Sequence, residues 1–86
     1  MDPQDKHQAV LLGSDIRTLR NNKNWTLATL SEKAGCSVGY LSEVERGERI
    51  VSVRLMRSIA GAFDLPIGWF FSHKNSYKFI NEKPFW

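Results

Sequence analysis

The sequence contains a single cysteine, Cys36, so neither a disulfide framework nor a cysteine-based metal site can form within the chain. Its two histidines, His7 and His73, are far apart and lack the spacing of metal ligands. No apolar run approaches the ~20 residues of a membrane helix, and the N-terminus does not resemble a signal peptide. We therefore expect a cytoplasmic protein without a metal or cofactor.

The sequence also lacks a recognisable set of catalytic residues. It has no histidine placed near a nucleophile and a carboxylate, no glycine-rich loop for phosphates, and no paired acids with a pocket to work in. We therefore do not expect an enzyme.

What is present is typical of one small folded domain of 86 residues. Hydrophobic residues make up 42% and charged residues 24%, which is enough for a modest core. The net charge of +3 is compatible with a polyanionic partner and equally with an ordinary solvated surface.

Apolar residues recur at helical spacing and predict an all-α fold of five short helices. The expected N-terminal caps are Thr26, Ser37 and Ser52, and the expected stops are Asn22, Gly35 and Gly47. The inward stripe of the fourth helix is expected to be Met56, Ile59, Ala60 and Phe63. Residues 1–8 are expected to be a flexible N-terminus, and residues 9–71 the helical domain. Residues 72–86 form an aromatic-rich tail, either a dimerisation segment or the start of a truncated second domain, in which "SYKFIN" could pair as a strand.

Two short helices joined by about three residues, "GCS", after a longer helix have the pattern of a helix-turn-helix. The stretches "TLATLSEKAGCSVGYLSEVERGER" and "SVRLMRSIAGAFDLPIGWFF" resemble the lambda-repressor-like (XRE, Cro/C1-type) helix-turn-helix DNA-binding family. The resemblance covers roughly residues 10–71. It implies a compact five-helix domain whose third helix, 37–46, enters the DNA major groove, and it implies a transcriptional regulator.

Helical rotation of about 100° per residue places Leu41 and Glu45 on one side of the third helix, together with Val38. This side is expected to face the body. Gly39 and Glu43 lie on the opposite side, where such helices meet base edges. A bare position at Gly39 would let the backbone approach DNA, although an exposed glycine without such a role is the alternative.

Individual side chains of this helix suit different DNA contacts. Ser37 fits a phosphate contact at the helix start. Tyr40 could meet a phosphate or a thymine methyl, or pack partly in the core. Glu43 could accept from cytosine N4, or be a solvated charge. The candidate DNA-contacting residues are Thr26, Leu27, Ser37, Val38, Gly39, Tyr40, Glu43, Arg46, Arg49 and Arg54.

Among the basic residues, Arg46 and Arg49 are the best phosphate ligands, whereas Arg54 and Arg57 are explained equally well by a solvated face. The chain departs from the family pattern at Leu27, where many members carry glutamine, and at Val51, where proline is usual. These departures affect the docking rather than the fold.

The inward carboxylate of Glu45 requires an inward cation, because an unpaired buried charge is costly. Arg20, one turn after Ile16 on the first helix, is the best candidate. The family resemblance implies the same pair at these two positions, with a structural role.

One short helix reads few bases, so we expect a homodimer on double-stranded DNA. The expected interface residues are Trp69, Phe70, Phe71, Tyr77 and Phe79, although the first three could instead close the core. The expected function is a sequence-specific, dimeric transcriptional repressor: a stand-alone repressor, a restriction-modification controller, or the DNA-binding part of a longer sensor. The alternative is a protein-interaction module or antitoxin-type partner that uses the helix-turn-helix as a scaffold for a protein partner.

Overall fold

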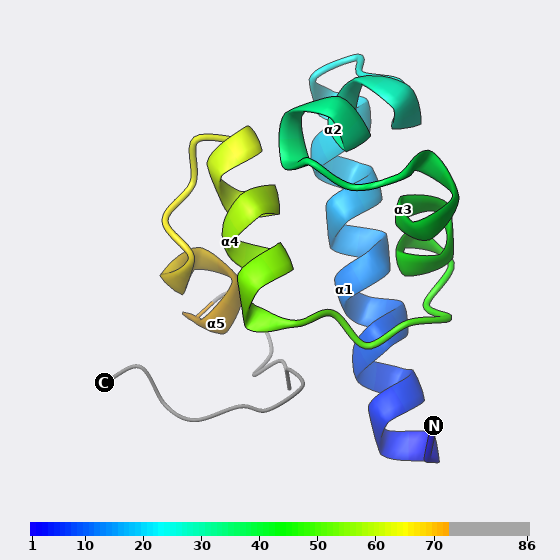
Figure 1. The fold of residues 1–86 in the computed structure, drawn as a ribbon. Coiled ribbons are helices and arrows are strands. Elements are labelled where there is room, and N and C mark those ends of the chain that lie inside the picture. The colour runs from blue at the N-terminus through cyan, green and yellow to red at the C-terminus, as the bar shows by residue number, and fades with distance from the viewer. Residues whose placement is uncertain (73–86) are drawn as a thin grey trace.

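The computed structural model describes residues 1–72, which form five α-helices and no β-strand (Figure 1). The helices are α1 (Pro3–Asn22), α2 (Leu27–Ala34), α3 (Val38–Glu45), α4 (Val53–Ala62) and α5 (Gly68–Ser72). α3 packs against α1, and α2 packs against both α3 and α4. The predicted all-α class is confirmed. None of the described helices combines the length and the apolar character needed to cross a membrane.

Side-chain caps start α2, α3 and α4 at the predicted residues. Thr26, Ser37 and Ser52 each accept the backbone N–H of the residue three positions later through their hydroxyl oxygen. Each bond satisfies one N–H group that the first helical turn leaves without a partner. Gly35 ends α2 with φ of 72°, in the left-handed region that glycine adopts without a Cβ clash.

The start of α1 differs from the prediction. Asp2 is its N-cap and accepts the N–H of Asp5 at 2.9 Å, and Pro3 occupies the first helical position. The fixed φ of proline suits this position, where no N–H is needed. The prediction of a flexible segment over residues 1–8 was therefore wrong from Pro3 onward, because Asp2 and Pro3 together supply a helix start.

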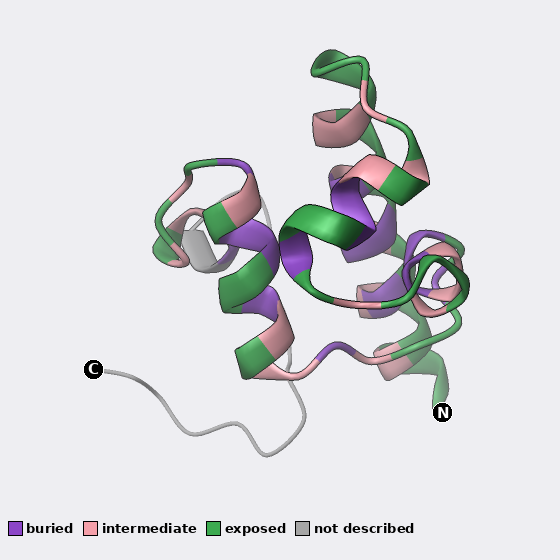
Figure 2. Ribbon diagram, turned by 45° about the horizontal axis from the view of Figure 1, so that its top comes forward, coloured by how far each residue is buried: buried purple, intermediate pink, exposed green. Residues whose placement is uncertain are grey.

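The core lies where the inner faces of the helices meet (Figure 2). The largest fully buried side chains are Phe70, Ile16, Leu30, Leu41, Met56, Ile59, Val44 and Val51. Burial of each such side chain is worth roughly 1.5–3 kcal/mol relative to exposure. The predicted inward stripe of α4 is confirmed, since all four of its residues are buried. The Trp25 ring also stacks on Phe63 at 5.2 Å between centroids, which attaches the segment before α2 to the end of α4.

α5 lies beside α4 after a turn at Asp64, whose φ is 57° (Figure 1). This turn inserts Phe70 into the core, where the residue is 0% exposed and meets Trp69 edge-on at 4.9 Å. The prediction of Phe70 as a dimer-interface residue was therefore wrong, and Phe70 closes the monomer core. The Phe71 side chain, Tyr77 and Phe79, and with them the predicted tail and its possible strand, lie outside the described residues.

Candidate nucleic-acid interface

A turn of three residues, 35–37, joins α2 to α3. The N–H groups of Gly35 and Cys36 both donate to the Ser31 carbonyl, at 2.8 and 3.1 Å, and Ser37 caps the next helix. Cys36 is half-buried in this turn, and burial raises the pKa of its thiol. These contacts fix the start of α3 relative to the end of α2.

One face of α3 is buried and the other is open. Leu41 and Val44 lie in the core, whereas Gly39 and Arg46 are exposed, as helical rotation predicts. Val38 is 43% exposed, so its predicted inward orientation was wrong. Val38 is the first residue of α3, seven positions before Glu45 at its buried end.

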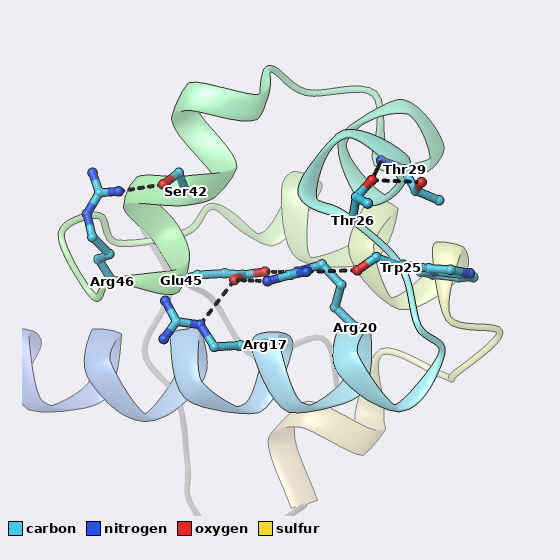
Figure 3. A network of polar contacts seen from close by, with 8 residues as sticks. All are labelled: Arg17, Arg20, Trp25, Thr26, Thr29, Ser42, Glu45 and Arg46. Carbon is cyan, nitrogen blue, oxygen red and sulfur yellow. Dashed lines mark hydrogen bonds and ion pairs between the residues drawn. The ribbon is translucent and has the colours of Figure 1, made fainter.

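Glu45 anchors α3 to α1 from behind this open face (Figure 3). Its side chain is 1% exposed, and Arg20 donates to it through Nε at 2.8 Å and through Nη2 at 3.0 Å. The bond to Glu45 is the main reason that the pKa of Arg20 is raised. Arg20 also donates through Nη1 to the Trp25 carbonyl at 2.8 Å. The structure thus contains the ion pair that the sequence predicted.

Arg17 is a second cation on the same carboxylate. Its Nε lies 3.3 Å from Oε1 of Glu45, and its side chain is half-exposed. Sequence reasoning missed this contact, although Arg17 precedes Arg20 by one helical turn and therefore lies on the same face of α1.

Arg46 and Glu48 form an ion pair at the end of α3. Arg46 donates through Nε to Glu48 at 2.8 Å and also to the Ser42 hydroxyl. The hydrogen bond between them raises the pKa of Arg46 and lowers that of Glu48. Both side chains are about half exposed, so water screens the pair and it contributes little to stability.

Arg49 links the loop after α3 to the outer face of the helix. It donates to Glu43 Oε1 at 2.8 Å, and its guanidinium lies over the Tyr40 ring, 5.6 Å from the centroid. The bond to Glu43 raises the pKa of Arg49, and burial raises the pKa of the half-buried Tyr40. Sequence reasoning missed this assembly, because Arg49 follows the turn at Gly47 and no helical spacing relates it to Glu43.

The remaining candidates lie on other elements. Leu27 is half-buried against the core, whereas Thr26 before α2 and Arg54 on α4 are exposed. The exposed candidate DNA-contacting residues are Thr26, Ser37, Val38, Gly39, Arg46, Arg49 and Arg54, and the half-buried ones are Leu27, Tyr40 and Glu43. No three histidine, cysteine or acidic side chains gather as metal ligands in the part of the chain that the structure describes.

A family model described as Helix-turn-helix matches residues 16–70, from the middle of α1 into α5. The chain belongs to this helix-turn-helix family. The lambda-repressor-like (XRE-type) resemblance of the stretches "TLATLSEKAGCSVGYLSEVERGER" and "SVRLMRSIAGAFDLPIGWFF" is confirmed.

Regulators and their solved structures are similar to this helix-turn-helix domain. The transcriptional regulator ClgR of Mycobacterium tuberculosis is 39% identical over 57 residues, 66% of this chain and 51% of ClgR. The crystal structure of the clp gene regulator ClgR from Corynebacterium glutamicum has a TM-score of 0.66 at 38% identity, covering 71% of this chain and 79% of that one. The restriction-modification controller protein C.AhdI from Aeromonas hydrophila has a TM-score of 0.67 at 34% identity, covering 69% and 89%. The chain therefore spans about half the length of the curated ClgR relative.

Proposed function

We propose that this helix-turn-helix domain binds specific double-stranded DNA sequences in the major groove and regulates transcription as a dimeric repressor. The observation that carries the proposal is the open face of α3. This face is exposed at Ser37 and Gly39, carries Arg46 at its end, and is anchored from behind by Glu45. A helix held in this way can enter the groove with its orientation already set. The cytoplasmic location expected from the sequence agrees with this function.

We expect some residues of the open face to contact phosphates and others to contact bases. Ser37 and the free N–H groups of the first turn of α3 suit a phosphate. Arg46 and Arg49 would also bind phosphates, because their exposed pairs with Glu48 and Glu43 are weak enough to exchange. Glu43, once released from Arg49, could accept a hydrogen bond from cytosine N4.

Gly39 provides the sharpest test of the docking face. A Cβ added there would have no atom within 4 Å, so Gly39→Ala should stabilise α3 by up to about 1 kcal/mol. On DNA, the same methyl group would lie between the helix and the groove, and affinity should fall. Gly61→Ala is the matched control, because Gly61 also lies in a helix with open space at its Cβ position.

The experiment starts with selection of duplexes from a random pool and measurement of affinity between 50 and 200 mM salt. With ~4–8 phosphate contacts, affinity should fall by orders of magnitude over this range. Both alanine variants should melt no lower than wild type, and only Gly39→Ala should lose affinity for the selected duplex. If no duplex is selected, the proposed function is wrong and the protein-interaction alternative gains support. If Gly39→Ala binds as wild type does, another face of the domain meets DNA.

We also propose that two copies bind one operator, because a single α3 of eight residues reads few bases. Trp69, half-buried on α5, remains a candidate for the interface, as do Phe71, Tyr77 and Phe79. Light scattering on the complex should show two protomers per selected site, with half-sites about one helical turn apart. One protomer per site would refute the dimer.

A further inference from the structure

We propose that the N-terminal part of α1, residues 3–15, positions the loop after α3 for DNA contact, with Lys6 as its positioning residue. The proposal rests on the function proposed above and concerns a part of α1 outside the matched range, 16–70. In Figure 1, the loop that leaves α3 crosses this part of α1.

The loop begins with a turn closed by its own backbone. Gly47 has φ of 75° and donates its N–H to the Val44 carbonyl at 3.0 Å, while the N–H of Glu48 donates to the Glu43 carbonyl at 2.9 Å. These two bonds form a Schellman motif. The carbonyl of Gly47 is left to accept from Lys6 Nζ at 2.8 Å, across 41 positions of sequence.

The backbones of α1 and of the end of α3 also meet at two points beside this bond. A Cβ on Gly47 would lie 2.7 Å from Val10 Cγ2 and 2.9 Å from Val10 Cα. A Cβ on Gly13 would lie 2.3 Å from the carbonyl oxygen of Val44. Lys6, Val10 and Gly13 are spaced four and three residues apart, so they form one face of α1. At Gly47 and Gly13, this face of α1 lies so close to α3 and its turn that a Cβ would not fit.

The bond from Lys6 falls between the two arginines proposed to bind phosphates. Arg46 precedes Gly47 and Arg49 follows it by two positions, so a fixed Gly47 carbonyl restrains both. The ammonium also lies near the C-terminal end of α3, where a positive charge interacts favourably with the helix dipole. Lys6 therefore holds the spacing between the loop and the open face of α3, and it would affect DNA binding without touching DNA.

The test compares Lys6→Met, which keeps the apolar stem and removes the charge and donor, with Lys6→Arg, which keeps both. We expect Lys6→Met to bind the selected duplex five- to tenfold more weakly, equivalent to about 1–1.4 kcal/mol. Its salt dependence should match that of wild type, because no phosphate contact is lost. Lys6→Arg should restore most of the affinity. A loss of equal size on selected and random duplexes, with a salt slope smaller by about 0.9, would make Lys6 a phosphate ligand and overturn the proposal.

Amide hydrogen exchange in the free protein supplies a readout that does not depend on DNA. The N–H groups of Gly47 and Glu48 should exchange several times faster in Lys6→Met than in wild type, and Lys6→Arg should return them toward the wild-type rate. Unchanged exchange would overturn the positioning role whatever the DNA result. If wild-type protein binds no duplex, the proposed function fails, and the exchange comparison still decides whether Lys6 holds the loop.

Discussion

The ion pair between Arg20 and Glu45 is the feature whose removal should affect folding most clearly. The Glu45 side chain is 1% exposed and that of Arg20 is 14% exposed, so each charge is stabilised by its partner more than by water. Removal of one partner from a buried pair costs ~3–5 kcal/mol. We expect about 3 kcal/mol for Glu45→Gln, at the low end, because Arg20 keeps some contact with solvent.

Arg20→Met should lower the free energy of unfolding by a comparable amount, for partly different reasons. Glu45 would keep only Arg17, at 3.3 Å, and the Trp25 carbonyl would lose its donor from Arg20. Urea unfolding of the two single variants and the double variant gives the coupling, which we expect to be at least about 1 kcal/mol.

Arg17→Met is the control, because Arg17 contacts the same carboxylate from a half-exposed position. It should cost only about 0–1 kcal/mol. If the losses of Arg20→Met and Glu45→Gln simply add, the two residues do not stabilise each other, and the reasoning from burial and bidentate geometry is refuted.

Three further predictions concern the core, a turn and a surface pair. Phe70→Ala should lower the free energy of unfolding by about 3–5 kcal/mol, because Phe70 belongs to the monomer core. The loss should be the same at low and high protein concentration. A loss that depends on concentration would place Phe70 at an interface. Gly47→Ala should lower the free energy of unfolding by at least about 1 kcal/mol in urea titrations, because its φ is 75° and a Cβ there would meet α1. Gly61→Ala, the control, should not lower it. Equal results for the two variants would contradict this prediction. The bond from Arg46 lowers the pKa of Glu48 below its ordinary 4.5, so the pair stabilises the fold above that pH and the gain is lost as pH falls through the lowered pKa. Thermal melts should therefore show a difference between wild type and Glu48→Gln at pH 7 that shrinks steadily as the pH falls below 4.5. A difference that does not change with pH would refute the linkage.

Local signals made much of the fold predictable. Thr26, Ser37 and Ser52 are capping residues whose bonds reach only three positions along the chain, and Gly35 ends its helix through its own backbone. The Arg20–Glu45 pair is long-range, but an inward carboxylate on α3 left few possible partners, and the family resemblance indicated the same one.

The parts that sequence reasoning missed depend on where elements meet in space. The contact of Lys6 with Gly47 and the contact of Arg49 with Glu43 join a loop to separate elements, and no periodicity encodes them. Val38 follows the inward period of α3 but lies on an uncovered turn. Phe70 is buried because the turn before α5 returns that helix to the core. Which residues contact DNA remains a prediction at every position of the open face.

Arg20 also determines how the domain opens. One guanidinium bonds to Glu45 at the end of α3 and to the Trp25 carbonyl just before α2, so neither helix can leave α1 without breaking a bond to the same side chain. Fluctuations that expose amides should therefore release α1, the start of α2 and the end of α3 as one cooperative unit. A duplex bound to the open face of α3 would then slow amide exchange along α1 as well, although none of the proposed DNA contacts lies on α1.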